Sequence, residues 1–370
     1  MRTPGRSVLQ SANKKQALGT TMVFKISNYQ VNNGRAGFLE NDLRNSGIDI
    51  IRAVSIALIL IWNLQPVTKA MMHIDSIVGA LGWLPIGFFY RYISLLAVPT
   101  FICISIMLFI KRSLFTQDYW KKRLIRLIEV FLFWTCIQFI FYLLGGGGFP
   151  LPLDTIIPTG GPELPYVGGS VFYFLFALTI CTGLAVLFLK LPDGLKFVVS
   201  TIIIILSCLI FVISSHYGIP LKVTEMENYY LYVPIAYYMV KHQDKLVRCR
   251  ILFIFGYILA IGYETGIARG TISMYARISV VFGVLSLISI LLPVQFERQP
   301  LIEFLSKYFL GIFSLHKYWQ YAFIVFLGII KPLVDIPIFS GNLVLFMTTI
   351  VLTFISVHLL GKTKLRRYVS

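Results

Sequence analysis

Charged residues are scarce in this chain, and their scarcity excludes most soluble proteins. Of the 370 residues, 13% are Asp, Glu, Lys or Arg, and 57% belong to the hydrophobic set. A typical soluble domain has about 25% charged and roughly 45–50% apolar residues. Only 16 residues are acidic and only five are histidine, so few groups could bind a metal or exchange protons. The composition predicts a protein that crosses a membrane several times and excludes a soluble enzyme.

Cysteine is also scarce, and its placement argues against a metal centre. The five cysteines show neither a CxxC motif nor a Cys/His spacing typical of metal ligands. Four of them lie inside apolar runs, where Cys usually acts as a small buried hydrophobic side chain. Cys249 lies in a basic cluster instead. We therefore predict no metal site and no permanently bound cofactor.

Long apolar runs are what the chain has in abundance. A helix needs about 20 residues to cross the hydrocarbon core, and ten runs are candidates, so residues 47–370 are predicted to form an all-α membrane bundle of about ten transmembrane helices. The runs are 48–67, 93–110, 127–144, 169–189, 197–215, 229–240, 251–267, 274–292, 309–330 and 342–360. The run 229–240 is the weakest, because it is short and rich in Tyr. Segment 82–92 contains Pro85 and Arg91 and is interpreted as interfacial or re-entrant.

The basic residues predict the orientation of these helices. With ten spans, 25 of the 33 Lys and Arg fall in the segments on one side, and five fall on the other. The positive-inside rule then places both termini in the cytoplasm. Residues 1–46 are basic and polar without periodicity, so we expect a disordered cytoplasmic tail that contacts anionic lipid. Because topology accounts for the positive charge, no nucleic-acid partner is predicted.

The first span contains two polar residues of interest, Arg52 and Asn63. Arg52 lies about one turn inside the cytoplasmic end. It could extend toward lipid phosphate with Asp49 as its partner, or it could have a function, since charges inside spans are costly. Asn63 follows eleven residues later, about 16 Å further along a helix. The two side chains are therefore expected at different depths in the membrane.

Two further places combine polar side chains with apolar surroundings. Arg123 and Arg126 are three residues apart and share one face of a helix. They could simply set the topology, or they could bind phosphates, because guanidinium groups suit bidentate contacts to phosphate. His316 lies beside Lys317 in an apolar run. A lone His is usually a structural group with satisfied hydrogen bonds, but this one is also a candidate proton carrier.

Four stretches together resemble the acyltransferase 3 family of multi-span membrane proteins. The first, IDIIRAVSIALILIWN (48–63), is similar to the Leu-Asp-x-Leu-Arg segment of the family, which ends in His after ten intervening residues. The second, AVPTFICISIMLFIKR (97–112), resembles a family span, and the third, YWKKRLIRLI (119–128), resembles its Arg-x-x-Arg motif. The fourth, LGIFSLHK (310–317), resembles a "SFGIYLLHP" stretch. A more distant similarity links FFYRYISLLAVPTFICIS to the membrane component for poly-N-acetylglucosamine intercellular adhesin.

The resemblance implies a multi-pass protein of the cell (inner) membrane that transfers an acyl group, often acetyl. Cytosolic acyl-CoA would be the co-substrate, and the acceptor would be a hydroxyl of a cell-surface glycan or a lipid-linked sugar. Arg52 takes the position of the family Arg. Arg123 and Arg126 take the positions of the Arg pair, for which binding of the CoA phosphates is the implied role. Membrane lipids are the other expected partners.

Asn63 departs from this pattern, because it stands where the family has its His. An amide does not exchange a proton near neutral pH, so Asn63 could hold a hydroxyl or carbonyl by hydrogen bonds but could not act as the general base. His316 could supply the base only if the ninth span packs close to the first. The alternative is a catalytically degenerate member that acts in glycan export or as the partner of a polysaccharide synthase. A secondary transporter is not favoured, because the two halves show no convincing internal repeat.

Overall fold

Helices make up most of the part of the chain that the structure describes. The computed structural model describes residues 46–67, 84–116, 118–165, 167–267, 273–297, 299–330 and 338–370. Within these ranges there is no strand, only an isolated bridge between Leu164 and Gly168. The all-α prediction is confirmed. The predicted cytoplasmic tail, apart from Ser46, lies outside the described residues.

Each of the ten predicted runs coincides with a helix, but six helices are long and apolar enough to cross a membrane among the residues described. These six are α2 (Ser46–Leu64), a helix from Leu84 to Ser113 that ends in α4 (Ala97–Ser113), α5 (Tyr119–Leu144), α7 (Tyr173–Lys190), α8 (Asp193–Tyr217) and α15 (Ile338–Leu360). Three further apolar helices are α11 (Arg250–Ile267), α12 (Ile278–Leu291) and α14 (Phe309–Ile330). The short ones are α6 (Ile156–Thr159), α9 (Tyr232–Lys241), α10 (Gln243–Arg248), α13 (Pro300–Lys307) and α16 (Arg366–Val369). Since α9 is only about 15 Å long, the count of ten spans stays a prediction.

The segment 82–92 differs from its prediction. From Leu84 the chain is helical up to Ser113, with a π-helical turn at Phe89–Ile93 and a 3-10 turn at Ser94–Leu96 before α4. Pro85 fits because it lies in the first described turn, where a helix needs no N–H partner. The side chain of Arg91 is exposed, so its charge is not buried in the packed interior. The segment is therefore part of a long helix, contrary to the prediction, whereas its position at the membrane interface stays a prediction.

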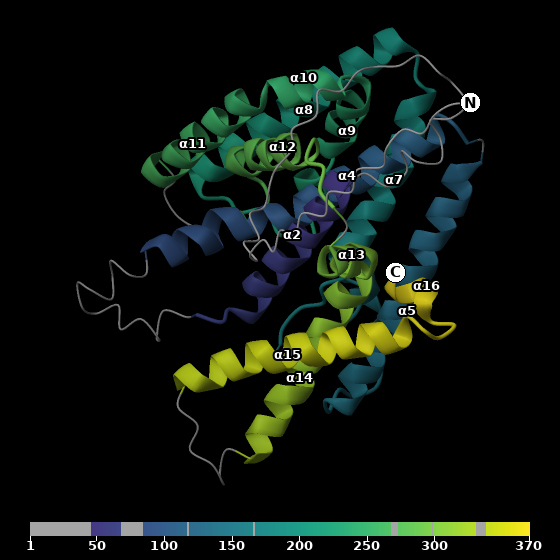
Figure 1. Cartoon of the computed structure of the whole chain (residues 1–370), viewed down its shortest axis with the longest axis vertical. Coiled ribbons are helices and arrows are strands. Elements are labelled where there is room, and N and C mark those ends of the chain that lie inside the picture. The colour runs from purple at the N-terminus through teal and green to yellow at the C-terminus, as the bar shows by residue number, and fades with distance from the viewer. Residues whose placement is uncertain are drawn as a thin grey trace, which may run out of the picture.

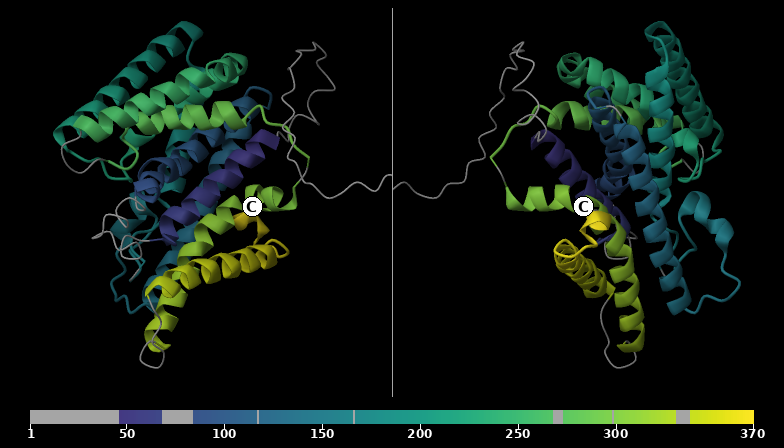
Figure 2. Two further views of the ribbon diagram at one scale, coloured as in Figure 1. Left: turned by 60° about the vertical axis from the view of Figure 1, so that its left-hand side comes forward. Right: turned by 90° about the vertical axis from the view of Figure 1, so that its right-hand side faces the viewer.

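The helices α2 and α4 form the centre of the bundle. In Figure 1 and in both views of Figure 2, α2 lies between the group that contains α8, α11 and α12 and the pair α14–α15. It packs against α4, α12, α13 and α14, while α4 also packs against α7 and α9. Side chains of α4 from Ile102 to Ile106 are buried. The first predicted span and the ninth are therefore in direct contact.

The outer helices expose apolar side chains, as expected for helices that face lipid. On α8 and α15 large aliphatic residues remain exposed along the whole length, which a soluble protein would bury. These residues include Ile202, Ile205, Leu209, Ile213, Val344, Met347, Val351 and Ile355. The protein is thus a multi-pass membrane protein by both its helix lengths and its surface.

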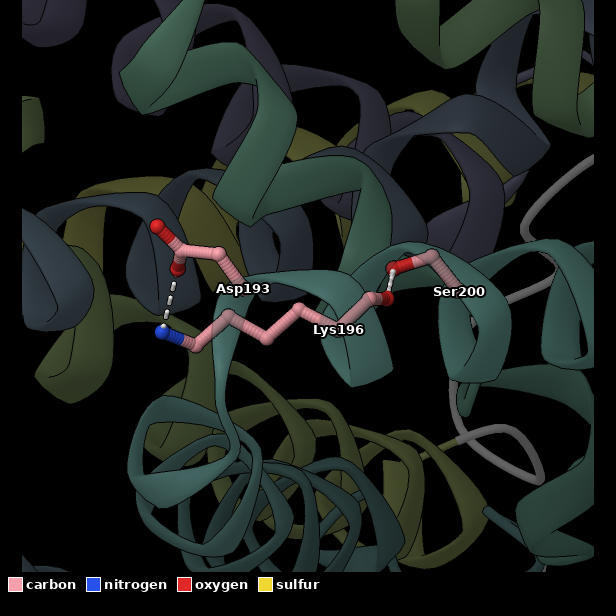
Figure 3. A network of polar contacts seen from close by, with 3 residues as sticks. All are labelled: Asp193, Lys196 and Ser200. Atoms are coloured by element: carbon pink, nitrogen blue, oxygen red, sulfur yellow. Dashed lines mark hydrogen bonds and ion pairs between the residues drawn. The ribbon is translucent and has the colours of Figure 1, made fainter.

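The start of α8 carries a local polar network over its first eight residues (Figure 3). Lys196 donates from Nζ to Oδ1 of Asp193 at 3.0 Å, and the hydroxyl of Ser200 donates to the main-chain oxygen of Lys196 at 2.6 Å. An acidic residue in the first turn also interacts favourably with the helix dipole. These contacts mark the boundary between the apolar helix and the short connection from α7.

Gly47 allows the start of α2 to lie directly on the end of α12. A Cβ atom at this position would lie 2.4 Å from the main-chain oxygen of Leu292 and 2.5 Å from that of Leu291. We therefore expect Gly47→Ala to lower the free energy of unfolding by about 1–3 kcal/mol, the usual cost of overpacking, and to lower Tm in detergent. Gly183→Ala on α7 is the matched control, because nothing lies within 4 Å of its Cβ position. Equal Tm values for both variants would contradict this close approach.

Candidate functional site

A basic cavity lies at the end of the bundle where α2 begins. It has a volume of about 430 Å³ and is formed by α2, α4, α5, α7, α13 and the start of α14. Five cationic side chains line it, and among the described lining residues there is no carboxylate side chain. These cations are Arg52, Lys122, Arg123, Arg126 and Lys307. We call this space the inner cavity, and its charge suits a ligand with several negative charges.

The structure brings together the three arginines that the sequence singled out. Arg52 comes from α2, whereas Arg123 and Arg126 come from the first two turns of α5. The Nε atom of Arg52 is buried and has no hydrogen-bond partner. Asp49, one turn before it, accepts a hydrogen bond from the hydroxyl of Ser306 on α13. Arg52 lines the inner cavity, and the accessible part of its guanidinium suits a contact with a phosphate oxygen.

A second cavity lies at the opposite end of the same helices. It has a volume of about 470 Å³ and is lined by the last turns of α2, by the residues just before α4, by α7 and by α14. Trp62 and Asn63 are among its walls, together with Lys317, whose Nζ donates to the main-chain oxygen of Val167 at 3.3 Å. The amide nitrogen of Asn63 donates to the oxygen of Ile59 at 3.0 Å. Arg52 and Asn63 thus lie in different cavities, as their spacing predicts.

The loop between α5 and α7 forms one wall of this outer cavity. Its residues Thr155, Thr159 and Glu163 line the space, and Glu163 is the one carboxylate among the described lining residues. Gln138 of α5 donates to the oxygen of Pro162 at 2.7 Å, which fixes the loop against the bundle. No sequence motif distinguishes Glu163, so its place in the cavity comes from the structure alone. Apart from a 3-10 turn and the short helix α6, this connection is irregular, and irregular segments often carry functional residues.

A layer of aromatic rings separates the two cavities. Phe101, Phe174 and Phe309 line the inner cavity, whereas Phe313 lines the outer one. The rings of Phe101 and Phe309 are stacked at 3.9 Å, and those of Phe174 and Phe313 are 4.1 Å apart in an edge-to-face arrangement. We call these four residues the aromatic partition. The contact between Phe174 and Phe313 thus joins the wall of the inner cavity to the wall of the outer one.

His316 lies next to the partition and is completely buried. Its Nδ1 is 3.2 Å from the main-chain oxygen of Ile312, and its ring is 6.0 Å from that of Phe313. Because a carbonyl only accepts, this contact places the proton on Nδ1, and Nε2 has no partner. The helix that carries His316 does pack against α2, the condition set by the sequence analysis. Among the residues described as lining either cavity, however, His316 does not occur.

A separate buried polar cluster connects α11 and α12. Glu264 accepts hydrogen bonds from the main-chain nitrogen of Ser279 at 2.9 Å and from its hydroxyl at 2.6 Å. Arg277 donates to the oxygen of Arg91 at 3.2 Å, which connects α12 to the helix that begins at Leu84. None of these residues lines either cavity in the described part of the chain, and their contacts fit a structural role. No group of three or more His, Cys, Asp or Glu is placed to bind a metal among the residues searched.

The fold and the geometry define a class of protein: a multi-pass helical membrane protein with two cavities. The cavity at one end is basic, and the cavity at the other is neutral and rich in hydroxyl groups. A family model described as an acyltransferase domain matches residues 45–361. The chain belongs to the acyltransferase 3 family, as the motifs predicted. Searches of the curated proteins and of the solved structures gave no match. Membership of this family identifies a membrane acyltransferase in general terms. It does not identify the donor, the acceptor or the roles of single residues.

Proposed function

We propose that the protein transfers an acyl group, in particular acetyl, from cytosolic acyl-CoA to a hydroxyl of a cell-surface glycan or lipid-linked sugar at the cell (inner) membrane. The observation that carries this proposal is the pair of cavities on the two sides of the aromatic partition. The five cations of the inner cavity match the phosphates of CoA, and the positive-inside rule places that cavity on the cytosolic side. The outer cavity offers groups that bind sugars.

The donor is proposed to bind with its phosphates on Arg52, Arg123 and Arg126. Each guanidinium can give paired, charge-assisted hydrogen bonds to phosphate oxygens. The acyl-bearing arm of CoA is uncharged and slender, so it is the part of the donor that suits an apolar passage between aromatic rings. This arrangement brings the thioester toward the outer cavity while the nucleotide stays at the inner one.

The acceptor is proposed to bind in the outer cavity. Trp62 offers an aromatic face, and Thr155, Thr159 and Tyr173 offer hydroxyl groups, a combination suited to a polar sugar. Asn63 would hold the acceptor hydroxyl or the thioester carbonyl by a hydrogen bond. Lys317 supplies positive charge near the oxygen that becomes negative in the transition state.

Transfer also needs a base, and we assign this role to Glu163. Its carboxylate would take the proton of the acceptor hydroxyl as the oxygen attacks the thioester carbon. The carbon–sulfur bond then breaks, and the proton passes to the departing thiolate of CoA. Glu163 is favoured over Asn63, which cannot exchange a proton, because it lines the outer cavity as a carboxylate. His316 is the second candidate, since its unpartnered Nε2 lies beside Phe313.

Purified protein in nanodiscs, supplied with radiolabelled acetyl-CoA, provides the test. We expect CoA binding and a slow release of acetate to water, with faster transfer when an oligosaccharide acceptor is added. The absence of CoA binding would contradict the proposal. CoA binding without turnover, combined with loss of the surface polymer on gene deletion, would favour the alternative of a degenerate member in glycan export or synthase partnership, which Asn63 suggests.

A further inference from the structure

The last residues of the chain pack against the inner cavity although they lie beyond the family match, which ends at residue 361. After α15 the chain turns back toward α5 and α14, and Figure 1 shows α16 beside α5. Ser370 is itself one of the residues that line the inner cavity. We call residues 362–370 the C-terminal segment. It is the part of this cavity that lies beyond the family match.

The C-terminal segment is held by a well-packed contact. Val369 is 1% exposed and lies against Gly311 of α14, where a Cβ atom would be 2.7 Å from that of Val369. The ring of Tyr368 stacks on Phe133 of α5 with centroids 4.0 Å apart. Trp134 donates from its indole nitrogen to the main-chain oxygen of Tyr368 at 3.1 Å. Contacts of this kind are typical of a fixed wall and not of a loosely attached tail.

The same segment binds one of the arginines of the inner cavity. Nη2 of Arg126 donates to the main-chain oxygen of Arg367 and, at 3.3 Å, to that of Ser370. A guanidinium has five N–H donors, so Nη1 and Nε of Arg126 keep three donors for another ligand. Arg126 and Trp134, roughly two turns apart on α5, therefore hold neighbouring carbonyl groups of one short stretch.

We propose that the C-terminal segment is part of the donor site, where it forms one wall of the inner cavity and positions Arg126 for a phosphate group of the donor. The inference rests on the proposed function, because it takes a phosphate-bearing donor as the ligand. Arg126 is on the surface-exposed first part of α5, where a long side chain has many rotamers. Fixing Nη2 on two carbonyls removes that freedom before the ligand arrives, which improves affinity.

The test compares donor binding by the full-length protein and three variants in nanodiscs of phosphatidylcholine, which contain no anionic lipid to compete for the cavity. The probes are CoA and adenosine 3′,5′-bisphosphate, its nucleotide part. The three variants change the segment in different ways. One is the deletion of residues 362–370, the second is Tyr368→Ala, which removes the ring stack, and the third is Gly311→Ala, which crowds Val369. We expect Kd for both probes and KM for acyl-CoA to rise about tenfold, the loss of one aligned phosphate contact, while kcat at saturating donor stays the same.

Two substitutions separate positioning from general damage. Tyr368→Phe keeps the ring stack and the main-chain carbonyl, so it should restore the affinity that Tyr368→Ala loses. Tyr217→Ala removes an exposed Tyr at the end of α8 and should leave Kd unchanged. Unchanged or tighter binding after the deletion would overturn the inference, because the segment would then be a bystander or an occluding element. If the unaltered protein binds neither probe, it is the proposed donor that fails.

Discussion

Glu163→Gln is expected to lower kcat for acyl transfer about 10²–10⁴-fold, the usual contribution of a general base. The amide keeps the size and polarity of the side chain but cannot take the proton of the acceptor hydroxyl. Because Glu163 lines the outer cavity and not the inner one, KM for acyl-CoA should stay close to its original value. The measurement is steady-state transfer of labelled acetyl to an oligosaccharide acceptor in nanodiscs.

Asp154→Asn is the matched control for this experiment. Asp154 is an exposed carboxylate in the same loop, and it is not among the described residues that line the outer cavity. Its variant should transfer acetyl at the original rate. If His316→Gln abolishes turnover while Glu163→Gln retains it, the imidazole is the base, and the assignment of Glu163 is wrong.

Arg52→Ala should raise KM for acyl-CoA roughly 10- to 100-fold, which corresponds to the loss of a hydrogen bond to a charged group. Arg52 lines the inner cavity, where its guanidinium can donate hydrogen bonds to a phosphate of the donor. If Arg52 binds the donor equally in the ground state and the transition state, KM should rise while kcat is retained. Initial rates over a range of acyl-CoA concentrations give both constants.

Two further variants define the cause of that change. Arg52→Lys keeps the charge but not the paired geometry, so an intermediate KM is expected. Arg248→Ala removes an exposed arginine at the end of α10, which does not line the cavity, and should have no effect. A loss of kcat without a change in KM would show that Arg52 acts on the reaction and not on donor binding.

The sequence predicted the helices well and the cavities only in part. Apolar length identifies each helix because a membrane requires every backbone hydrogen bond to be made within the segment. At 84–92, Pro85 and Arg91 suggested a separation from the following span, but the chain is helical there. The first turn tolerates Pro, and the Arg side chain simply remains exposed. Local sequence shows which residue types are present. Whether a helix tolerates a Pro or an Arg depends on the position of that residue in the helix and on its neighbours in the fold.

The spacing along the sequence also predicted that Arg52 and Asn63 lie far apart in the fold. The spacing of eleven positions from Arg52 to Asn63 places them at different depths, and the structure gives each its own cavity. The contributions of Glu163 and of the C-terminal segment were missed, since both depend on contacts between distant parts of the chain. Glu163 is brought to the cavity by a loop held by Gln138, and Ser370 by the packing of Tyr368 and Val369. No local pattern encodes such contacts.

The aromatic partition also bears on the permeability of the membrane to ions and protons. A protein with a water-accessible cavity at each end of its bundle could short-circuit the proton and ion gradients of the membrane. Tightly packed apolar rings expel water, and a dry constriction blocks ions and protons far more strongly than it hinders an uncharged chain. Phe174 and Phe313, in contact at 4.1 Å, therefore let the two cavities share an apolar boundary without making the protein a leak.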